Sequence, residues 1–183
     1  AAFLYPLTES LRKAGYYSWP GSTFDAEGRQ LQYMSRLKAM ESSLGMQISV
    51  DAKPLDETDS VTQFIAEVKA EPPDALFLAP FKKGHWPHVT RIIEETKLPT
   101  VVLGTLGVLL APQVREIHRR SGVYMINSLD NFEAVEQGMR MIRTTAWMRQ
   151  SSILNIARSA ATDRVVPRIG TKVRTVANTG YIE

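Results

Sequence analysis

ALFLA, residues 75–79, is a nearly continuous apolar run that lies between a Pro-Pro pair and Pro80. A strand with no alternating polar residues has both of its faces buried, which is typical of a parallel sheet covered by helices on both sides. This stretch therefore decides the fold class that we predict for the whole chain.

Further apolar runs precede and follow this strand at regular intervals. We interpret as strands the segments 14–19 (AGYYSW), 46–50 (MQISV), 100–103 (TVVL), 123–126 (VYMI), 152–157 (SILNIA) and 172–176 (KVRTV). Amphipathic stretches long enough to form crossover helices separate most of them. We predict an α/β fold with a three-layer, mostly parallel, doubly wound sheet of the Rossmann or flavodoxin type. Residues 1–13 are interpreted as an N-terminal extension, and residues 14–183 as a single α/β domain that is the first part of a longer protein.

The helices are recognised by their ends and by the spacing of their apolar residues. Ser22 and Asp25 have the spacing of a capping box, and Gly45 is placed to end the helix that follows. Asp59 or Ser60 is expected to cap the next helix. Further helices are predicted to begin at Pro87 and Pro112, and the longest to span 131–149. The residues expected to face inward on the first two helices are Leu31, Met34, Leu37, Leu44, Val61, Phe64, Ile65 and Val68.

Composition sets limits on the function. The chain has 183 residues, no cysteine and a formal net charge of +3. Disulfides and cysteine nucleophiles are therefore excluded, and the small, dispersed basic excess argues against a nucleic-acid partner. The apolar runs are all too short to span a bilayer, so we expect no membrane insertion. A cytoplasmic location fits, although a removed export signal is an alternative.

Candidate ligand-binding residues follow from the expected topology. In an open parallel sheet, ligands bind beyond the carboxyl ends of the strands, where loops lead into helix N-termini. The strand-end residues are aromatic, hydroxylic, amide and cationic, a mixture that suits a sugar or a sugar phosphate. Our candidates are Trp19, Ser22, Phe81, Lys82, Thr105, Asp130, Asn131 and Arg158. Plain structural roles compete with this interpretation: Asp130 and Asn131 can cap the long helix, Trp19 can pack under a loop, and Lys82 can belong to a solvated loop.

Common catalytic and cofactor motifs do not account for the sequence. Gly104 and Gly107 lack the spacing and the third glycine of a dinucleotide site, and no phosphate-binding loop or nucleophile elbow occurs. His85 and His88 are separated by Trp86 and Pro87 and have no nearby carboxylate in sequence to complete a metal site. We therefore expect no catalytic residue, no metal site and no cofactor in this chain.

Four segments carry a resemblance to known families: PDALFLAPF (73–81), RIIEETKLPTVVLGT (91–105), GVYMINSLDNFEAVEQGMRMIRT (122–144) and SSILNIARSAATDRVVPRIGTKVRTV (151–176). Together they resemble the N-terminal domain of the L-fucose/L-arabinose isomerase-like proteins. The same order of segments also resembles type I periplasmic sugar-binding proteins and their repressor relatives. The first resemblance implies a substrate-side or assembly role, with aldose–ketose isomerisation and any divalent metal residing in later domains. It also implies a homo-oligomer in which Trp19 and the 81–88 loop help to close a site.

Three functional hypotheses follow. The first is the N-terminal substrate-side or assembly domain of a sugar isomerase-like protein, so that whether this chain takes part in an enzyme stays open. The alternative is a sugar-binding module of periplasmic or repressor type without catalysis. The third is a pure interaction domain, which the apolar segment 106–110 would suit.

Overall fold

The computed structural model describes residues 1–13, 24–51, 53–105, 108, 111–128, 130–158 and 160–178. The chain divides into two compact units, Ala1–Arg140 and Met141–Glu183. Each unit is described separately below. The predicted strand 14–19 lies outside the described residues.

The first unit is built on a four-stranded sheet in which all strands are parallel. Its strands are β1 (Ala2–Leu4), β2 (Leu76–Pro80), β3 (Thr100–Leu103) and β4 (Val123–Ile126), in the spatial order β1-β2-β3-β4. The register pairs Ala2 with Leu78, Leu76 with Thr100, and Thr100 with Val123. Every residue of β1, β2 and β3 is buried. The predicted parallel α/β sheet is confirmed.

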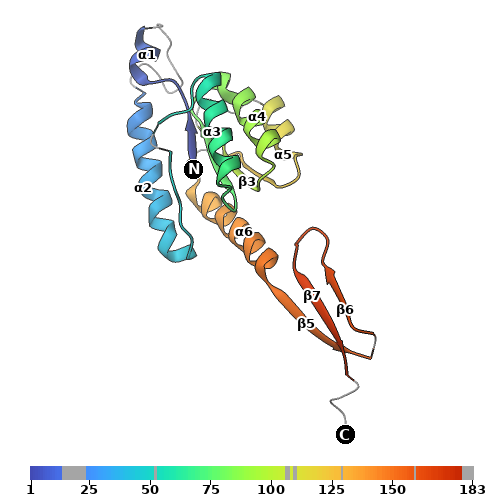
Figure 1. Cartoon of the computed structure of the whole chain (residues 1–183). Coiled ribbons are helices and arrows are strands. Elements are labelled where there is room, and N and C mark those ends of the chain that lie inside the picture. The colour runs from blue at the N-terminus through green and yellow to red at the C-terminus, as the bar shows by residue number, and fades with distance from the viewer. Residues whose placement is uncertain are drawn as a thin grey trace. The chain divides into compact units, whose positions relative to one another are not determined.

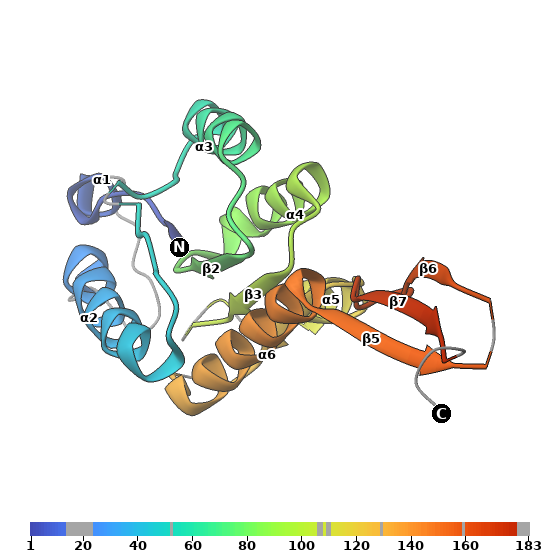
Figure 2. The same cartoon turned by 60° about the horizontal axis from the view of Figure 1, so that its bottom comes forward.

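Helices cover both faces of this sheet, which makes three layers (Figures 1 and 2). One face packs against α3 (Thr58–Ala70), α4 (Trp86–Thr96) and α5 (Ala111–His118). The other face packs against α2 (Ala26–Leu44) and the first turns of α6 (Phe132–Gln150). A short α1 (Thr8–Lys13) and a 3-10 turn, η1 (Lys83–His85), complete the unit. The fold class is therefore the predicted Rossmann or flavodoxin-like α/β arrangement.

Alternation along each strand divides the core into two halves. Leu4, Leu78 and Val102 point to the face covered by α3, α4 and α5. Their neighbours Phe3 and Phe77 point to the opposite face, where the Phe3 ring lies 6.3 Å from the Tyr33 ring of α2. Burial on both faces explains why these strands contain almost no polar residue.

Close packing of α6 on β3 and β4 depends on Gly138. A β-carbon built on this glycine would lie 2.8 Å from Tyr124 Cδ1 and 3.0 Å from Val101 Cγ2. Both distances are shorter than a normal van der Waals contact. The missing side chain therefore lets the start of α6 approach the sheet.

The C-terminal end of α2 confirms one expectation, whereas its N-terminal end and its buried face correct two others. Asp25 is itself the N-cap of α2 and not the N3 residue of a capping box begun by Ser22, which lies outside the described residues. Asp25 accepts a hydrogen bond from the Gly28 N–H at 2.9 Å, and Gly45 ends the helix in the left-handed conformation with φ of 56°. Leu31, expected to face inward, is 65% exposed. Tyr33 and Gln30 occupy the buried face in its place, together with the expected Leu37 and Leu44. The polar and aromatic residues at these positions are what the apolar spacing failed to identify.

The segment 46–50 is not the strand that we predicted. The following residues run beside β1 and donate two backbone hydrogen bonds to it, from Asp51 N–H to the Ala1 carbonyl at 2.9 Å and from Leu55 N–H to the Phe3 carbonyl at 2.8 Å. A regular parallel ladder would use the N–H of Lys53 in between. That N–H instead donates to the Asp51 carboxylate at 3.2 Å, and Pro54 has no N–H to offer. The edge of β1 is thus covered by an irregular segment.

The N-terminal residues also differ from expectation. The segment 1–13, interpreted as an extension, contains β1 and α1, and β1 pairs with β2 in the sheet. Three residues of apolar sequence before Pro6 are too short to be distinguished from an unstructured end.

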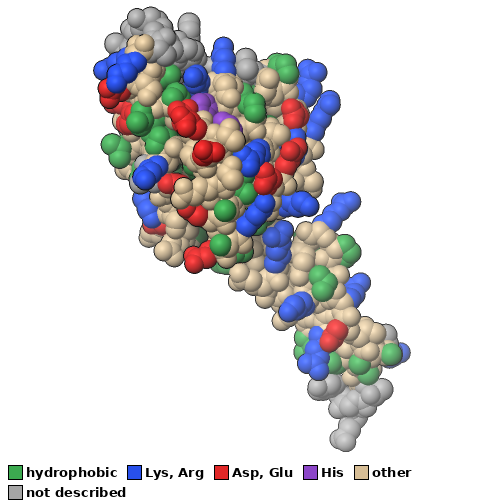
Figure 3. Space-filling view, turned by 45° about the horizontal axis from the view of Figure 1, so that its top comes forward, with side chains coloured by type: hydrophobic (Ala, Val, Ile, Leu, Met, Phe, Trp, Pro, Cys, Tyr) green, Lys and Arg blue, Asp and Glu red, His purple; other side chains and the backbone are tan. Residues whose placement is uncertain are grey.

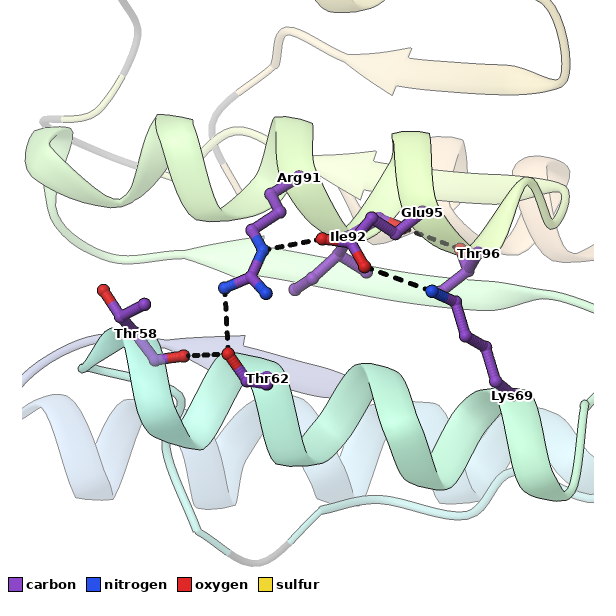
Figure 4. A network of polar contacts seen from close by, with 7 residues as sticks. All are labelled: Thr58, Thr62, Lys69, Arg91, Ile92, Glu95 and Thr96. Atoms are coloured by element: carbon purple, nitrogen blue, oxygen red, sulfur yellow. Dashed lines mark hydrogen bonds and ion pairs between the residues drawn. The ribbon is translucent and has the colours of Figure 1, made fainter.

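A polar network joins α3 to α4 on the surface of the first unit (Figure 4). The Glu95 carboxylate accepts hydrogen bonds from Arg91 Nε at 2.7 Å and from Lys69 Nζ at 3.1 Å. Arg91 also donates to Thr62 Oγ1 at 3.0 Å. The buried residues Val61, Phe64, Ile65 and Val68 of α3 are those predicted, although the helix begins at Thr58 without a side-chain cap, and Ser60 bonds to the Glu57 carbonyl.

The second unit contains the end of α6 and a separate three-stranded sheet. Its strands are β5 (Ser152–Ala157), β6 (Thr162–Val165) and β7 (Lys172–Ala177), in the order β5-β7-β6. β5 and β7 are parallel, whereas β6 and β7 are antiparallel. The expectation that 152–157 and 172–176 continue the first sheet is corrected by this topology. β6 was not predicted at all, because its charged sequence, TDRV, has no apolar run.

Candidate functional site

The carboxyl ends of β1 to β4 lie at one edge of the first sheet, which Figure 3 views from above. Chain segments that follow these strands bring three of the predicted residues, Phe81, Thr105 and Asp130, to this edge. Histidine and acidic side chains lie next to one another on this face (Figure 3). We refer to this region as the carboxyl edge.

An aromatic cluster forms the floor of the carboxyl edge. The Phe81 ring is stacked on Tyr5, with centroids 5.2 Å apart, and meets Tyr33 edge-on at 5.7 Å. Phe24 approaches its ring at 6.1 Å. Because Phe81 is only 2% exposed, a ligand ring would reach it only after one of these neighbours moved.

Tyr5 is itself held by a buried hydrogen bond. Its hydroxyl donates to Gln30 Oε1 at 2.6 Å, and Gln30 Nε2 donates to the Asp51 carbonyl at 3.2 Å. Burial, reinforced by the negative charges of Glu27 and Asp25, raises the pKa of Tyr5 to about 12. The hydroxyl therefore stays protonated and acts as a donor at neutral pH.

Asp130 is the best-defined polar group at this edge. It occupies the left-handed region with φ of 50°, two residues before α6 begins. Its carboxylate accepts a hydrogen bond from the Tyr33 hydroxyl and another from Arg29 Nη1 at 2.9 Å. Burial and the bond to Asp130 raise the pKa of Tyr33, so the phenol remains a donor. The side chains of Arg29 and Asp130 stay 32% and 43% exposed, so the pair is open to solvent.

Asn131 has the capping role that competed with ligand binding. Its Oδ1 accepts a hydrogen bond from the Ala134 N–H at 3.0 Å, and its Nδ2 donates to Ser128 Oγ at 3.2 Å. Thr105 is buried and donates to the Pro80 carbonyl at 2.7 Å, which ties the ends of β3 and β2 together. These two predicted residues therefore build the edge, whereas Lys82 lies half-buried beside it.

Two predicted residues lie outside the described part of the chain, and one belongs to the second unit. Trp19 and Ser22 are the two that lie outside the described residues. Arg158 follows β5 and is exposed.

A buried histidine–aspartate pair was missed by the sequence interpretation. His85 is 4% exposed, and its Nε2 lies 3.0 Å from Asp56 Oδ1, which comes from the segment before α3. Burial lowers the pKa of His85, and the opposing attraction of Asp56 is the smaller effect. The aspartate is the more exposed partner, at 39% of its side chain. The histidine therefore fastens the β2–α4 connection to the 51–57 segment from inside the protein.

The arrangement suits recognition of hydroxyl groups. Asp130 offers carboxylate lone pairs, Arg29 offers N–H donors, and both are positioned by neighbours before a ligand arrives. Arg29 and Tyr33 were missed because they reach the edge from a helix, not from a strand end. Among the described residues, no cluster of three or more histidine or acidic side chains could hold a metal ion.

No family model and no curated protein sequence matches the chain. In the described part of the chain, none of the helices is both long and apolar enough to cross a membrane.

Proposed function

We propose that the first unit is the substrate-side wall of a sugar isomerase-like protein, with aldose–ketose conversion carried by groups outside this chain. The ligand is a small sugar or sugar phosphate at the carboxyl edge. The observation that carries the proposal is the exposed Asp130 carboxylate, held in place by Tyr33 and Arg29.

Sugar hydroxyls need an acceptor and a donor at each position, because an unpaired polar group loses its bonds to water without replacement. Asp130 and Arg29 supply one of each on adjacent atoms. Tyr33 removes the freedom of the carboxylate to rotate, which lowers the entropic cost of binding. Lys82, two residues after the end of β2, adds a positive charge for a phosphate group.

A second candidate is a sugar-binding module without catalysis. It is favoured by the start of a separate sheet at β5, immediately after α6. In a two-lobed binding protein the chain crosses from one sheet to a second one in this way.

Titration calorimetry with a panel of monosaccharides and their phosphates tests whether the carboxyl edge binds sugars. Arg29→Gln and Asp130→Asn should each weaken binding by about tenfold or more. Arg91→Gln is the matched control, because Arg91 is 34% exposed and also pairs with a carboxylate, but on the α3–α4 surface. A sugar that binds equally to the wild type and to both edge variants would place its site elsewhere, and the absence of heat across the panel would reject both candidates.

The two candidates differ in the form of the sugar that they favour. Isomerisation requires the open chain, because only that form has a free carbonyl group. An alditol, which cannot close into a ring, should therefore bind the isomerase-like wall at least as tightly as the corresponding aldose. A binding module built for the ring should instead prefer the cyclic sugar, and calorimetry with a matched aldose and alditol separates them.

A further inference from the structure

The second unit presents an open strand edge. β5 pairs with β7, and none of the described strands pairs with its other side. The ladder is set by hydrogen bonds from Lys172 N–H to the Ser151 carbonyl at 3.2 Å and from Asn178 N–H to the Ala157 carbonyl at 3.0 Å. In a parallel ladder alternate residues bond to the same neighbour, so Ile153 and Asn155 face β7. The N–H and C=O groups of Leu154 and Ile156 therefore point to the open edge.

The side chains of β5 do nothing to protect this edge. The strand, SILNIA, contains no charge, no proline and no glycine. Leu154 is 62% exposed and Ile156 is 53% exposed. The opposite edge, β6, carries Asp163 and Arg164. Charges are the usual means of preventing further strand pairing, so the two edges of one sheet differ: β6 is protected, and β5 is suited to receive another strand.

The two units differ in net charge. Residues 141–183 contain seven Lys or Arg and two Asp or Glu, a net charge of +5, whereas residues 1–140 contain fifteen and seventeen, a net charge of −2. The register of β5 and β7 places Leu154 and Ile156 on the same face as Lys172 and Arg174. Figure 3 shows Lys and Arg side chains interspersed with hydrophobic ones over this unit.

We propose that β5 is a docking edge for an extended strand of an acidic partner protein, in which apolar and acidic residues alternate. The partner backbone would pair with Leu154 and Ile156, its apolar side chains would cover theirs, and its carboxylates would meet Lys172 and Arg174. This inference concerns the second unit alone and does not depend on the proposed sugar site.

Two other occupants fit less well. A single-stranded nucleic acid stacks its bases on aromatic side chains, but β5 offers aliphatic side chains, and the Arg143 guanidinium already lies 3.7 Å from the centroid of the Trp147 ring in α6. A second copy paired through its own β5 would bring together two units of net charge +5. Both remain outcomes of the experiment.

The test uses the full chain and a fluorescein-labelled peptide of about ten residues that alternates glutamate with valine. Fluorescence anisotropy should show binding that weakens with added salt. A peptide alternating lysine with valine, and a peptide with the glutamates and valines in separate blocks, should bind at least about tenfold more weakly. Hydrogen exchange should show new protection at the amides of Leu154 and Ile156, with little change at Ile153 and Asn155, which already face β7.

Two substitutions have matched controls. Leu154→Asp should abolish binding, whereas Leu31→Asp, at a leucine that is 65% exposed on α2, should not. Arg174→Glu should weaken binding, whereas Arg119→Glu, at an exposed arginine of the first unit, should not. Circular dichroism checks that each variant is folded, and the amide protection in the wild type is informative even if Leu154→Asp is not.

Three results would overturn the proposal. One is equal affinity for the acidic and basic alternating peptides, or no binding of either. Another is tighter binding of a single-stranded oligonucleotide than of the acidic peptide. The third is protection of the Leu154 and Ile156 amides without any peptide, together with a dimer in sedimentation, which would identify a second copy as the occupant.

Discussion

β2 and β5 are similar apolar strands with opposite surroundings. β2 reads LFLAP and is buried at every residue, whereas β5 reads SILNIA and is exposed at five of its six residues. β2 has a strand on each side and helices on both faces, whereas β5 has one neighbouring strand within the described part of the chain. Apolar sequence therefore indicates that a segment forms a strand, but the burial of that strand depends on elements far away in the chain.

The largest effect is expected when a leucine side chain is shortened to alanine in each of the two strands. Leu78→Ala in β2 should lower the free energy of unfolding of the first unit by about 2–5 kcal/mol, because Leu78 is fully buried. Leu154→Ala in β5 should change stability by less than about 0.5 kcal/mol. Urea unfolding followed by circular dichroism measures both, and equal losses would show that β5 is buried in solution.

A smaller change tests how tightly the first unit is packed. Gly138→Ala adds one methyl group where Tyr124 and Val101 already lie within 3.0 Å. Overpacking costs about 1–3 kcal/mol and the gain in helix propensity returns about 1 kcal/mol, so we expect a net loss of about 1 kcal/mol.

Gly84→Ala is the control for this substitution, because nothing lies within 4 Å of a β-carbon built there. If Gly138→Ala instead stabilises the protein in urea unfolding, the contact between α6 and the sheet is looser than described.

Acid should lower the stability of the first unit more than that of the second. The pKa of His85 is lowered from its ordinary value of 6.5 by burial, so the folded first unit binds fewer protons than the unfolded chain. The part of its stability that depends on a neutral His85 is therefore complete above pH 6.5 and decreases as the pH falls from there through the lowered pKa.

The second unit contains no histidine, so its stability should stay nearly constant between about pH 7 and 5. Thermal unfolding at several pH values, with a histidine titration by NMR, measures the difference. A His85 that titrates at or above its ordinary pKa would contradict the explanation.

The smallest effect is expected on the α3–α4 surface. Hydrogen bonds from Arg91 and Lys69 lower the pKa of Glu95, so the ion pairs contribute above its ordinary pKa and are lost in acid. Water and salt screen charges at the surface. Glu95→Gln should therefore lower the thermal midpoint only slightly, and less in high salt, whereas a large loss would show that the network fixes the two helices.

The sequence predicts best those strands whose own residues show the apolar pattern. The runs 75–79, 100–103 and 123–126 are predicted as strands because each is a short apolar segment, and burial on both faces explains the lack of polar residues in 75–79. β1 was missed because three residues before a proline carry too little pattern. β5 and β7 were recognised as strands, but which sheet they join depends on pairing, and pairing leaves little local signal.

In the candidate site, too, the residues that could be predicted are those marked by a local sequence pattern. Asp130 and Phe81 were found because they follow strands, and the parallel topology fixes where strands end. Arg29 and Tyr33 lie on α2, and their only local signal is their i, i+4 spacing on one helix face. The pairing of His85 with Asp56 joins segments that are distant in sequence, so no motif marks it.

The pairing of Ala2 with Leu78 has a consequence for folding during synthesis. At roughly 5–20 residues per second, the first strand leaves the ribosome on the order of 4–15 s before its partner strand does. The segment that bonds to Ala1 and Phe3 through Asp51 and Leu55 is made earlier and lies on the other side of β1. One edge of the nascent β1 can therefore be covered by its own chain before β2 is made to cover the other edge. This cover shortens the time in which that edge of β1 could pair with a neighbouring nascent chain.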